Sequence, residues 1–284
     1  MSGNVSMRFV SSMEKVFPGK EPGRPIERIS ALKNERLNFQ LVVISLFERK
    51  GECKWKIKGA LASYARVRIV DFAKGYYNNR PDSDDYVIFH DCGVTLYPEI
   101  LRTPDYTDLS LYPDVFRALW ITVYAPEGLP AGEHDFTVEL CDWMGEPLAG
   151  ETLKVRIIDA ELEKNDLIVT NWLHYDCIEA YYGEKIFSEG YYALLGKFMT
   201  SAFSHGINTV YTPLFTPPLD TQRGGERRTV QTVGVKATEE GYEFDFTELE
   251  KFVKFARARG AEYFELSHLA TQWGAQFCPK IMAE

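Results

Sequence analysis

Residues 207–221 read INTVYTPLFTPPLDT, and this stretch decides how the second half of the chain is organised. A short apolar β-type run, Ile207 to Tyr211, passes directly into a segment with prolines at 213, 217 and 218. Proline fixes φ and withholds a backbone donor, so the segment is predicted as a shaped loop and not as a helix interior or central strand. The loop carries hydroxyls and a carboxylate, Asp220, that no local structure requires. It is therefore predicted to face a ligand from a rigid scaffold.

The strand before this loop belongs to a strand, helix, strand pattern. Leu167 to Leu173 is a mostly apolar run typical of a strand, and Glu189 to His205 has the apolar spacing of a helix. Together with Ile207 to Tyr211, these segments predict a βαβ unit with parallel strands. His205 closes the helix, where its side chain is expected to interact with the C-terminal end of the helix dipole.

A hairpin, a helix and a third strand follow the loop. The hairpin strands are predicted at Thr229 to Lys236 and Tyr242 to Phe246. Thr247 is then predicted to cap a helix that reaches Arg259. Ala261 to Leu266 has the composition of the next strand, so the second half contains three parallel strands in all.

Residues 1–160 show a different pattern of short β-rich runs separated by turn residues. No long helical period interrupts these runs, which predicts an antiparallel β-sandwich. The stretch from Tyr76 to Tyr112 is rich in aromatic, Asp and Pro residues and has little periodicity, so it is predicted as a long loop excursion. The β-rich runs are Arg36 to Ser45, Ala65 to Phe72, Ala118 to Tyr124, Gly132 to Cys141 and Glu151 to Ile158.

Composition narrows the class of protein. A chain of 284 residues with 45% hydrophobic residues exceeds the usual single-domain size, so two domains are expected. The net charge is −9 and no basic stretch is long enough to follow a phosphate backbone, so nucleic acid is not an expected partner. Five scattered cysteines without CxxC spacing are expected to be reduced, buried thiols. No run has the length or apolar character of a signal peptide or membrane span, and a cytoplasmic protein is expected.

Each of the three predicted parallel strands ends in a polar and aromatic loop. The C-terminal ends of parallel strands lie on one side of a sheet, and this side is the working face of α/β barrels. The loops are therefore expected to form one substrate-binding surface, with no metal ion and no cofactor. The candidate residues on this surface are Trp172, His174, Asp176, Thr212, Asp220, Arg227, Glu265, His268, Gln272 and Trp273.

Several of these residues also have structural interpretations. His174 and Asp176 could ligate a metal ion, but no third ligand stands at a recognisable spacing, so hydrogen bonding to a substrate or within the protein is preferred. Tryptophans are more often core residues than platforms for a ligand ring, and Trp273 is favoured for stacking because it lies in a loop. Tyr181 and Tyr182 could rim a pocket or pack against the long loop.

The charged candidates could form ion pairs that hold the loops in place. Asp220 is expected to pair with Arg227 and hold the proline loop, or to bind hydroxyls of a substrate. Glu265 stands at a strand end and is the best carboxylate for a functional role. An ion pair of Glu265 with Arg223 or Arg227 would explain it equally well.

The motifs of both halves, taken in order, resemble glycoside hydrolase family 123. The first half contains RLNFQLVV (36–43), which is similar to the N-terminal sandwich of that family. The resemblance covers nearly the whole chain, and the proline loop with HLATQWGA is quite specific. The motifs of the second half, similar to the opening of the catalytic domain, are NWLHYD (171–176), TPLFTPPLDT (212–221), GGERRTVQ (224–231), FDFTEL (244–249) and HLATQWGA (268–275).

The resemblance implies a β-sandwich over residues 1–160, followed over residues 161–284 by about three βα units of a TIM-type (β/α)8 barrel. It also implies hydrolysis of terminal β-linked N-acetylgalactosamine with retention, where the acetamido oxygen of the substrate is the nucleophile. The implied partner is a glycan or glycolipid that carries N-acetylgalactosamine. Three strands cannot close a barrel of eight, so the barrel is expected to be truncated, and its exposed apolar edges would favour self-association.

The catalytic carboxylates of the family have no counterpart in this sequence. In the family an adjacent Asp-Glu pair on a later barrel loop orients the acetamido group and protonates the leaving oxygen. No Asp-Glu dipeptide occurs among the 284 residues, and the pairs Asp84-Asp85 and Glu239-Glu240 fall in the loop excursion and the hairpin turn. No catalytic residue is therefore assigned. The alternative function is that of a non-catalytic carbohydrate-binding or scaffold protein.

Overall fold

The chain forms two compact units, residues 1–163 and residues 164–284. Within the described part of the chain, no helix combines the length and apolar character needed to cross a bilayer. The computed structural model describes residues 4–46, 50–76, 94–104, 109–163, 166–218, 221–222, 225–270 and 278–284.

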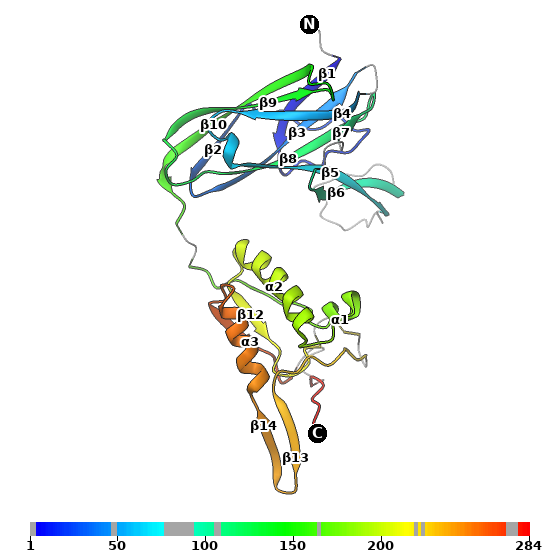
Figure 1. The fold of residues 1–284 in the computed structure, drawn as a ribbon, viewed down its shortest axis with the longest axis vertical. Helices are drawn as coiled ribbons and strands as arrows, with labels where there is room; N and C mark the ends of the chain where they lie inside the picture. Colours follow the sequence, from blue (N-terminus) through cyan, green and yellow to red (C-terminus); the bar gives the residue numbers. More distant parts are fainter. Residues whose placement is uncertain are drawn as a thin grey trace, which may run out of the picture. The chain divides into compact units, whose positions relative to one another are not determined.

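Unit 1 is built from two five-stranded sheets that enclose one core (Figure 1). The first sheet has the order β1 (Val5–Ser11), β3 (Arg36–Ser45), β8 (Arg117–Tyr124), β5 (Ala65–Tyr76) and β6 (Val94–Arg102). The second has the order β2 (Arg28–Lys33), β10 (Pro147–Glu161), β9 (Gly132–Cys141), β4 (Lys50–Lys58) and β7 (Leu109–Leu111). A 3-10 turn, η1 (Ala62–Tyr64), precedes β5.

Alternating apolar residues explain why these strands pack as two layers. Phe39 and Leu41 on β3 point inward, and Phe136 on β9 meets them from the other sheet, all fully buried. The rings of Phe39 and Phe136 lie edge to face with centroids 5.4 Å apart. Phe9 on β1 joins the same cluster at 5.6 Å from Phe39. Side chains of period two thus bury one face of each sheet and build the core between them.

Two expectations for unit 1 need correction. The sandwich is not wholly antiparallel, because β2 pairs with β10 in parallel. Hydrophobic alternation sets which face is buried but not the direction of the neighbouring strand. The stretch Tyr76 to Tyr112 is not all loop, because β6 pairs with β5 and β7 pairs with β4. The sequence hides β6 because it contains Pro98, which is tolerated where the strand lies at the edge of a sheet. Residues 77–93 lie outside the described residues.

Of the four cysteines that the structure describes, only Cys53 meets the expectation of a buried thiol, and Cys92 lies outside the described residues. Cys53 is buried, and this burial raises the pKa of its thiol to about 11. Cys141 is half-buried, whereas Cys177 and Cys278 are exposed. All four are free thiols.

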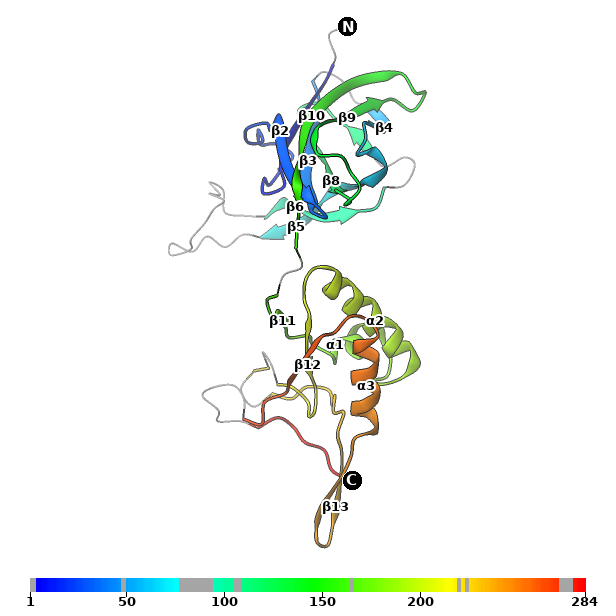
Figure 2. The same ribbon diagram turned by 90° about the vertical axis from the view of Figure 1, so that its left-hand side faces the viewer.

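Unit 2 contains a parallel sheet with the order β11 (Thr170–Asn171), β12 (Thr209–Thr212) and β15 (Tyr263–Leu266). The first strand is shorter than predicted, because it begins at Thr170 and the residues Leu167 and Ile168 before it are exposed. The helices α2 (Glu189–Ser204) and α3 (Thr247–Arg257) lie on the same side of β12 (Figure 2). Their apolar faces and the sheet share one buried cluster that includes Leu195, Met199 and Phe252. The three parallel strands are present, and their place in the first part of a TIM-type barrel stays a prediction.

The turns of unit 2 contain a hairpin and helix ends that differ in detail from the sequence expectation. The hairpin strands are β13 (Gly234–Thr238) and β14 (Gly241–Asp245), and they project from the unit (Figure 1). Thr247 is not the cap of α3. The carboxylate of Asp245 accepts hydrogen bonds from the backbone N–H of Thr247 (2.9 Å) and from its hydroxyl (2.6 Å). At the end of α2, Nδ1 of His205 lies 2.7 Å from the carbonyl oxygen of Ser201.

Candidate functional site

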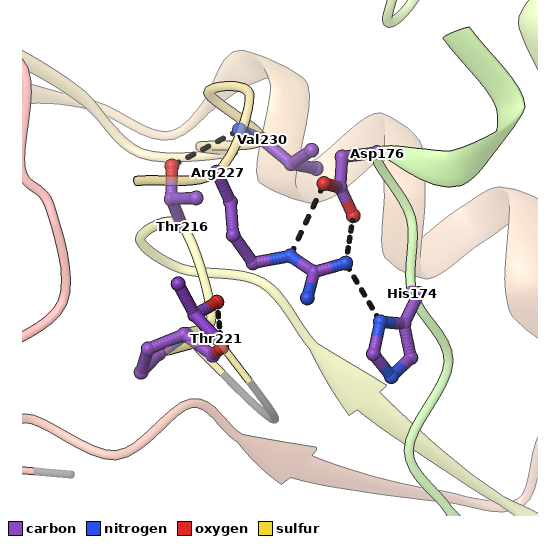
Figure 3. Close-up of polar contacts among 7 residues, drawn as sticks. His174, Asp176, Thr216, Thr221, Arg227 and Val230 are labelled. Carbon is purple, nitrogen blue, oxygen red and sulfur yellow. Dashed lines mark hydrogen bonds and ion pairs between the residues drawn. The ribbon is translucent and has the colours of Figure 1, made fainter. Parts of the chain in front are cut away.

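Arg227 joins the proline loop to the segment after β11 (Figure 3). Its Nε donates to Oδ2 of Asp176 at 3.1 Å, and its terminal nitrogen donates to Oδ1 at 2.9 Å. The same terminal nitrogen lies 2.7 Å from Nδ1 of His174. The side chains of Arg227 and Asp176 are only 15% and 14% exposed, so this is a largely desolvated ion pair. A guanidinium can only donate, so Nδ1 of His174 accepts this hydrogen bond.

A buried tyrosine positions the two partners of Arg227. Tyr175 lies between His174 and Asp176 in the sequence and is 2% exposed. Its hydroxyl donates to the backbone carbonyl of Tyr211 in β12 at 2.7 Å. Burial raises the pKa of Tyr175 far above its ordinary value. This anchor ties the segment after β11 to the neighbouring strand, immediately before the short helix α1 (Cys177–Tyr182).

Threonine hydroxyls fix the proline loop on its other side. The hydroxyl of Thr216 accepts from the N–H of Val230 at 3.0 Å (Figure 3). The hydroxyl and the N–H of Thr232 donate to the carbonyl oxygen of Pro213 at 2.8 and 3.0 Å. Thr216 and Thr232 are both buried. These bonds satisfy backbone groups that the prolines leave without a strand partner, and they hold the segment that carries Arg227.

Glu265 organises a second group at the strand ends. Its Oε2 accepts from the indole Nε1 of Trp172 and from the hydroxyl of Thr170, both at 3.0 Å. The indole stacks on the ring of Tyr211, with centroids 5.0 Å apart and an interplanar angle of 25°. Trp172 is nevertheless 49% exposed, so Glu265 and Tyr211 fix the orientation of an aromatic plane that remains open to solvent.

His268 belongs to the same group. Its Nδ1 lies 3.2 Å from the hydroxyl of Tyr211, and its ring meets Trp172 at a centroid distance of 5.4 Å. Burial raises the pKa of Tyr211, so this hydroxyl stays protonated at neutral pH. His268 itself is exposed. The second group therefore presents an aromatic ring, an imidazole and a carboxylate at the C-terminal ends of three neighbouring strands.

The structure places the sequence candidates in different ways. Trp172, Glu265 and His268 come together in one group, and His174, Asp176 and Arg227 in the other. Arg227 pairs with Asp176, and Glu265 forms no ion pair with Arg227 among the described residues. Thr212 is fully buried and its hydroxyl donates to the carbonyl of Val210, which corrects the expectation that it faces a ligand. Asp220, Gln272 and Trp273 lie outside the described residues.

Three contributors were missed by the sequence reasoning. They are Thr170, Tyr175 and Tyr211, each of which orients a candidate residue through a side-chain bond or ring contact. Tyr211 had a detectable signal, because it is the last residue of the β-type run before the proline loop. Tyr175 stands between two polar residues, His174 and Asp176, and this alternation is typical of an extended segment with one buried side.

The first group, made of His174, Asp176 and Arg227, contains two of the three residues that could ligate a metal ion. Ligand atoms of His174, Asp176 and Cys177 lie within 4.8 Å of one another. The guanidinium of Arg227 already contacts Nδ1 of His174 and both carboxylate oxygens of Asp176. A metal cation would have to displace this positive group. The arrangement therefore fits an ion-pair cluster better than a metal centre.

An apolar hollow of about 540 Å³ adjoins the first group. His174 lines it, so the hollow begins where the ion-pair cluster ends. Tyr181 and Tyr182 of α1 are among its walls, and they are exposed by 83% and 49%. The other lining residues are Leu173, Tyr175, Cys177, Ile178, Ala180, Leu195 and Phe198.

Comparison with known proteins agrees with the motifs of the second half. Residues 172–284 match the model of the glycoside hydrolase 123 catalytic domain. The chain is also similar to the structure of a family 123 glycoside hydrolase from Clostridium perfringens, which was solved to follow glycolipid glycan hydrolysis. The TM-score is 0.67 at 12% sequence identity, and the match covers 90% of this chain and 46% of that chain. The resemblance to this family is confirmed, and the chain spans about half the length of that relative.

Other solved structures are less similar. AvmM, which catalyses macrocyclization in alchivemycin A biosynthesis, has a TM-score of 0.33 at 6% identity, covering 58% of this chain and 94% of that one. A FixG-related protein from Vibrio parahaemolyticus has a TM-score of 0.27 at 10% identity, covering 55% and 96%. These scores are too low to indicate a shared fold. None of the curated proteins matches the sequence significantly.

Proposed function

We propose that unit 2 carries part of the sugar-binding face of a family 123 glycoside hydrolase. In its full-length form the enzyme hydrolyses terminal β-linked N-acetylgalactosamine of a glycan or glycolipid. The observation that carries this proposal is the exposed indole of Trp172, which Glu265 and Tyr211 hold at the C-terminal ends of parallel strands. An oriented aromatic plane beside hydrogen-bonding groups suits a pyranose ring, which has an apolar face and hydroxyls at its edge.

Each group has a distinct role in this proposal. Trp172 stacks on the sugar ring. This role passes to Trp172 from Trp273, which the sequence favoured, because Glu265 and Tyr211 orient the indole of Trp172. Glu265 and His268 bind hydroxyls at the edge of that ring. The ion-pair cluster of His174, Asp176 and Arg227 keeps the proline loop in place. Asp220, Gln272 and Trp273 keep the sugar-binding role that the sequence predicts for them.

The reaction needs groups that we place outside residues 1–284. In a substrate-assisted retaining mechanism the acetamido oxygen attacks the anomeric carbon, and the glycosidic oxygen accepts a proton as its bond breaks. One carboxylate orients the acetamido N–H and another donates the proton. The sequence has no Asp-Glu dipeptide to fill these roles. We therefore propose that residues 164–284 are an incomplete barrel and that this chain alone binds sugar without turnover.

The lack of that dipeptide also favours a second candidate, a carbohydrate-binding or scaffold protein that never had catalytic activity. The two candidates make different predictions for a longer reading frame. An Asp-Glu pair on the loop after the next barrel strand supports the enzyme. A longer frame without such a pair supports the binding protein.

The test is to incubate the chain with an aryl N-acetyl-β-galactosaminide and to measure both release of the aryl group and binding by calorimetry. We expect saturable binding and no turnover above a buffer control. Trp172→Ala should abolish the binding, whereas Trp143→Ala, which removes an exposed tryptophan from unit 1, should leave it unchanged. Trp172→Phe keeps an aromatic ring and should retain part of the affinity. Turnover that Glu265→Gln abolishes would show that the chain carries its own acid.

A further inference from the structure

Three arginines gather on the outer face of the first sheet of unit 1. The register pairs Arg66 with Thr122 and Thr122 with Asn38, and it pairs Arg68 with Trp120. Arg36 is paired with Tyr124 one row further along the same strands. Directly opposed residues of an antiparallel sheet point to the same side. Arg36, Arg66 and Arg68 therefore share one face with Asn38, Thr122 and Tyr124, and we call this set the arginine face.

This face points away from the sandwich core. The alternate residues of the same strands, including Leu37, Ile69 and Ile121, are buried in the core between the sheets. The segment after β1 covers only one part of the outer side, where Gln40 donates to the carbonyls of Ser11 (3.1 Å) and Glu14 (2.8 Å). Arg36 and Arg66 remain exposed, and Arg68 and Thr122 are half-buried.

Within the part of the chain that the structure describes, no carboxylate pairs with the arginine face. Among the described residues, none of the three guanidiniums forms an ion pair with Asp or Glu. Elsewhere on the same sheet, Arg117 and Arg102 share the carboxylate of Asp71. Burial and the neighbouring Arg66 guanidinium lower the pKa of Arg68. Two adjacent positive groups without a counter-charge repel each other, and a bound anion would offset this repulsion.

We propose that the arginine face binds an acidic glycan through its sulfate or carboxylate groups. Planar guanidiniums match such oxyanions through paired hydrogen bonds. Between them, the hydroxyl of Thr122 donates to the side-chain oxygen of Asn38 at 2.8 Å, which leaves the amide hydrogens of Asn38 for sugar oxygens. Tyr124 is 44% exposed and adds an aromatic surface at the edge.

The charge of the whole protein selects among anionic partners. A net charge of −9 repels the dense phosphates of nucleic acid, for which three guanidiniums on a flat face are a small footprint. A glycan with well-spaced acidic groups suits such a face better. The choice of a glycan rests on the proposed function, in which unit 2 of the same chain binds sugar.

The test measures binding of the full chain to heparin, a sulfated glycan, by surface plasmon resonance at low salt. Polygalacturonate supplies carboxylates alone, dextran supplies a neutral polymer, and inorganic sulfate competes as a free anion. We expect heparin or polygalacturonate to bind, dextran not to bind, and sulfate to compete. The variant Arg66→Gln/Arg68→Gln should weaken binding by about tenfold or more.

The control variant Arg24→Gln/Arg156→Gln removes the same charge from exposed positions of unit 1 and should leave binding nearly unchanged. Arg66→Lys/Arg68→Lys keeps the charge and should lose less affinity for heparin than the Gln variant. This second variant keeps the proposal testable if the Gln variant misfolds. Equal losses in the Gln variant and the control would overturn the proposal, and so would a DNA oligonucleotide that binds as tightly as heparin. Trp172→Ala should leave heparin binding intact, so failure of the sugar site and failure of the arginine face can be told apart.

Discussion

The guanidinium of Arg227 holds the carboxylate of Asp176 through two hydrogen bonds, although 51 residues separate them in the chain. One partner lies in the long loop after β12 and the other lies just before α1, so the pair fixes two loops at neighbouring strand ends. His174 accepts a third bond from the same guanidinium. This geometry makes the pair a positioning element of the proposed sugar face.

Replacing Arg227 by Lys should therefore loosen the proline loop. Lysine keeps the charge but cannot reach both carboxylate oxygens and His174 at once. We expect a loss of about 1–3 kcal/mol in the unfolding free energy of unit 2, measured by denaturant titration. Arg228→Lys is the matched control, because Arg228 is 56% exposed and its pair with Glu179 should contribute less than about 1 kcal/mol. Equal effects of the two substitutions would contradict the positioning role.

Glu265→Ala should release the indole of Trp172. The change removes the acceptor of two hydrogen bonds at 3.0 Å, from Trp172 and Thr170. We expect a stability loss of about 1–3 kcal/mol and a red shift of tryptophan emission, because the indole N–H then turns to water. Glu265→Gln keeps one acceptor oxygen in place and should show a smaller effect. Unchanged emission in the Ala variant would show that Trp172 is held by other contacts.

Asp245 should make the stability of unit 2 depend on pH in the acid range. Hydrogen bonds from Thr247 lower the pKa of Asp245 in the folded state. A carboxyl with a lowered folded pKa stabilises the fold above its ordinary value of about 3.8, and this contribution is lost as the pH falls towards the folded pKa. Thermal melts of Asp245→Asn should therefore show a deficit at pH 6 that shrinks towards pH 2. A deficit that does not change with pH would contradict this cause.

The sequence predicted the elements of unit 2 better than their partners. The apolar run at Ile207 to Tyr211 located β12, and the prolines located the loop, because both signals are local. The choice of Asp176 as the partner of Arg227 depends on how two loops meet across the sheet, which no local pattern encodes. The same reason explains why Tyr175 and Tyr211 were missed, since their importance comes from contacts between strands. The direction of β2 against β10 is likewise a property of the topology.

The two units should differ in their resistance to protease. Unit 1 encloses its core between two complete sheets, so residues 1–163 are expected to fold on their own. Unit 2 leaves apolar side chains such as Leu266 and Leu269 exposed at the end of its sheet. Limited proteolysis followed by mass spectrometry should therefore leave a stable N-terminal fragment that ends near residue 163. A surviving C-terminal fragment with a digested N-terminal half would contradict this expectation.

The most direct test of the proposed sugar face follows the indole N–H resonance of Trp172 by NMR, identified by its absence in Trp172→Phe. Titration with an aryl N-acetyl-β-galactosaminide should shift this resonance in a saturable way, because the sugar would stack on a ring whose N–H is held by Glu265. The indole resonance of Trp143 in unit 1 should not move. A Trp172 resonance that stays in place at saturating sugar concentrations would show that these strand ends do not bind the sugar, and the central claim would fail.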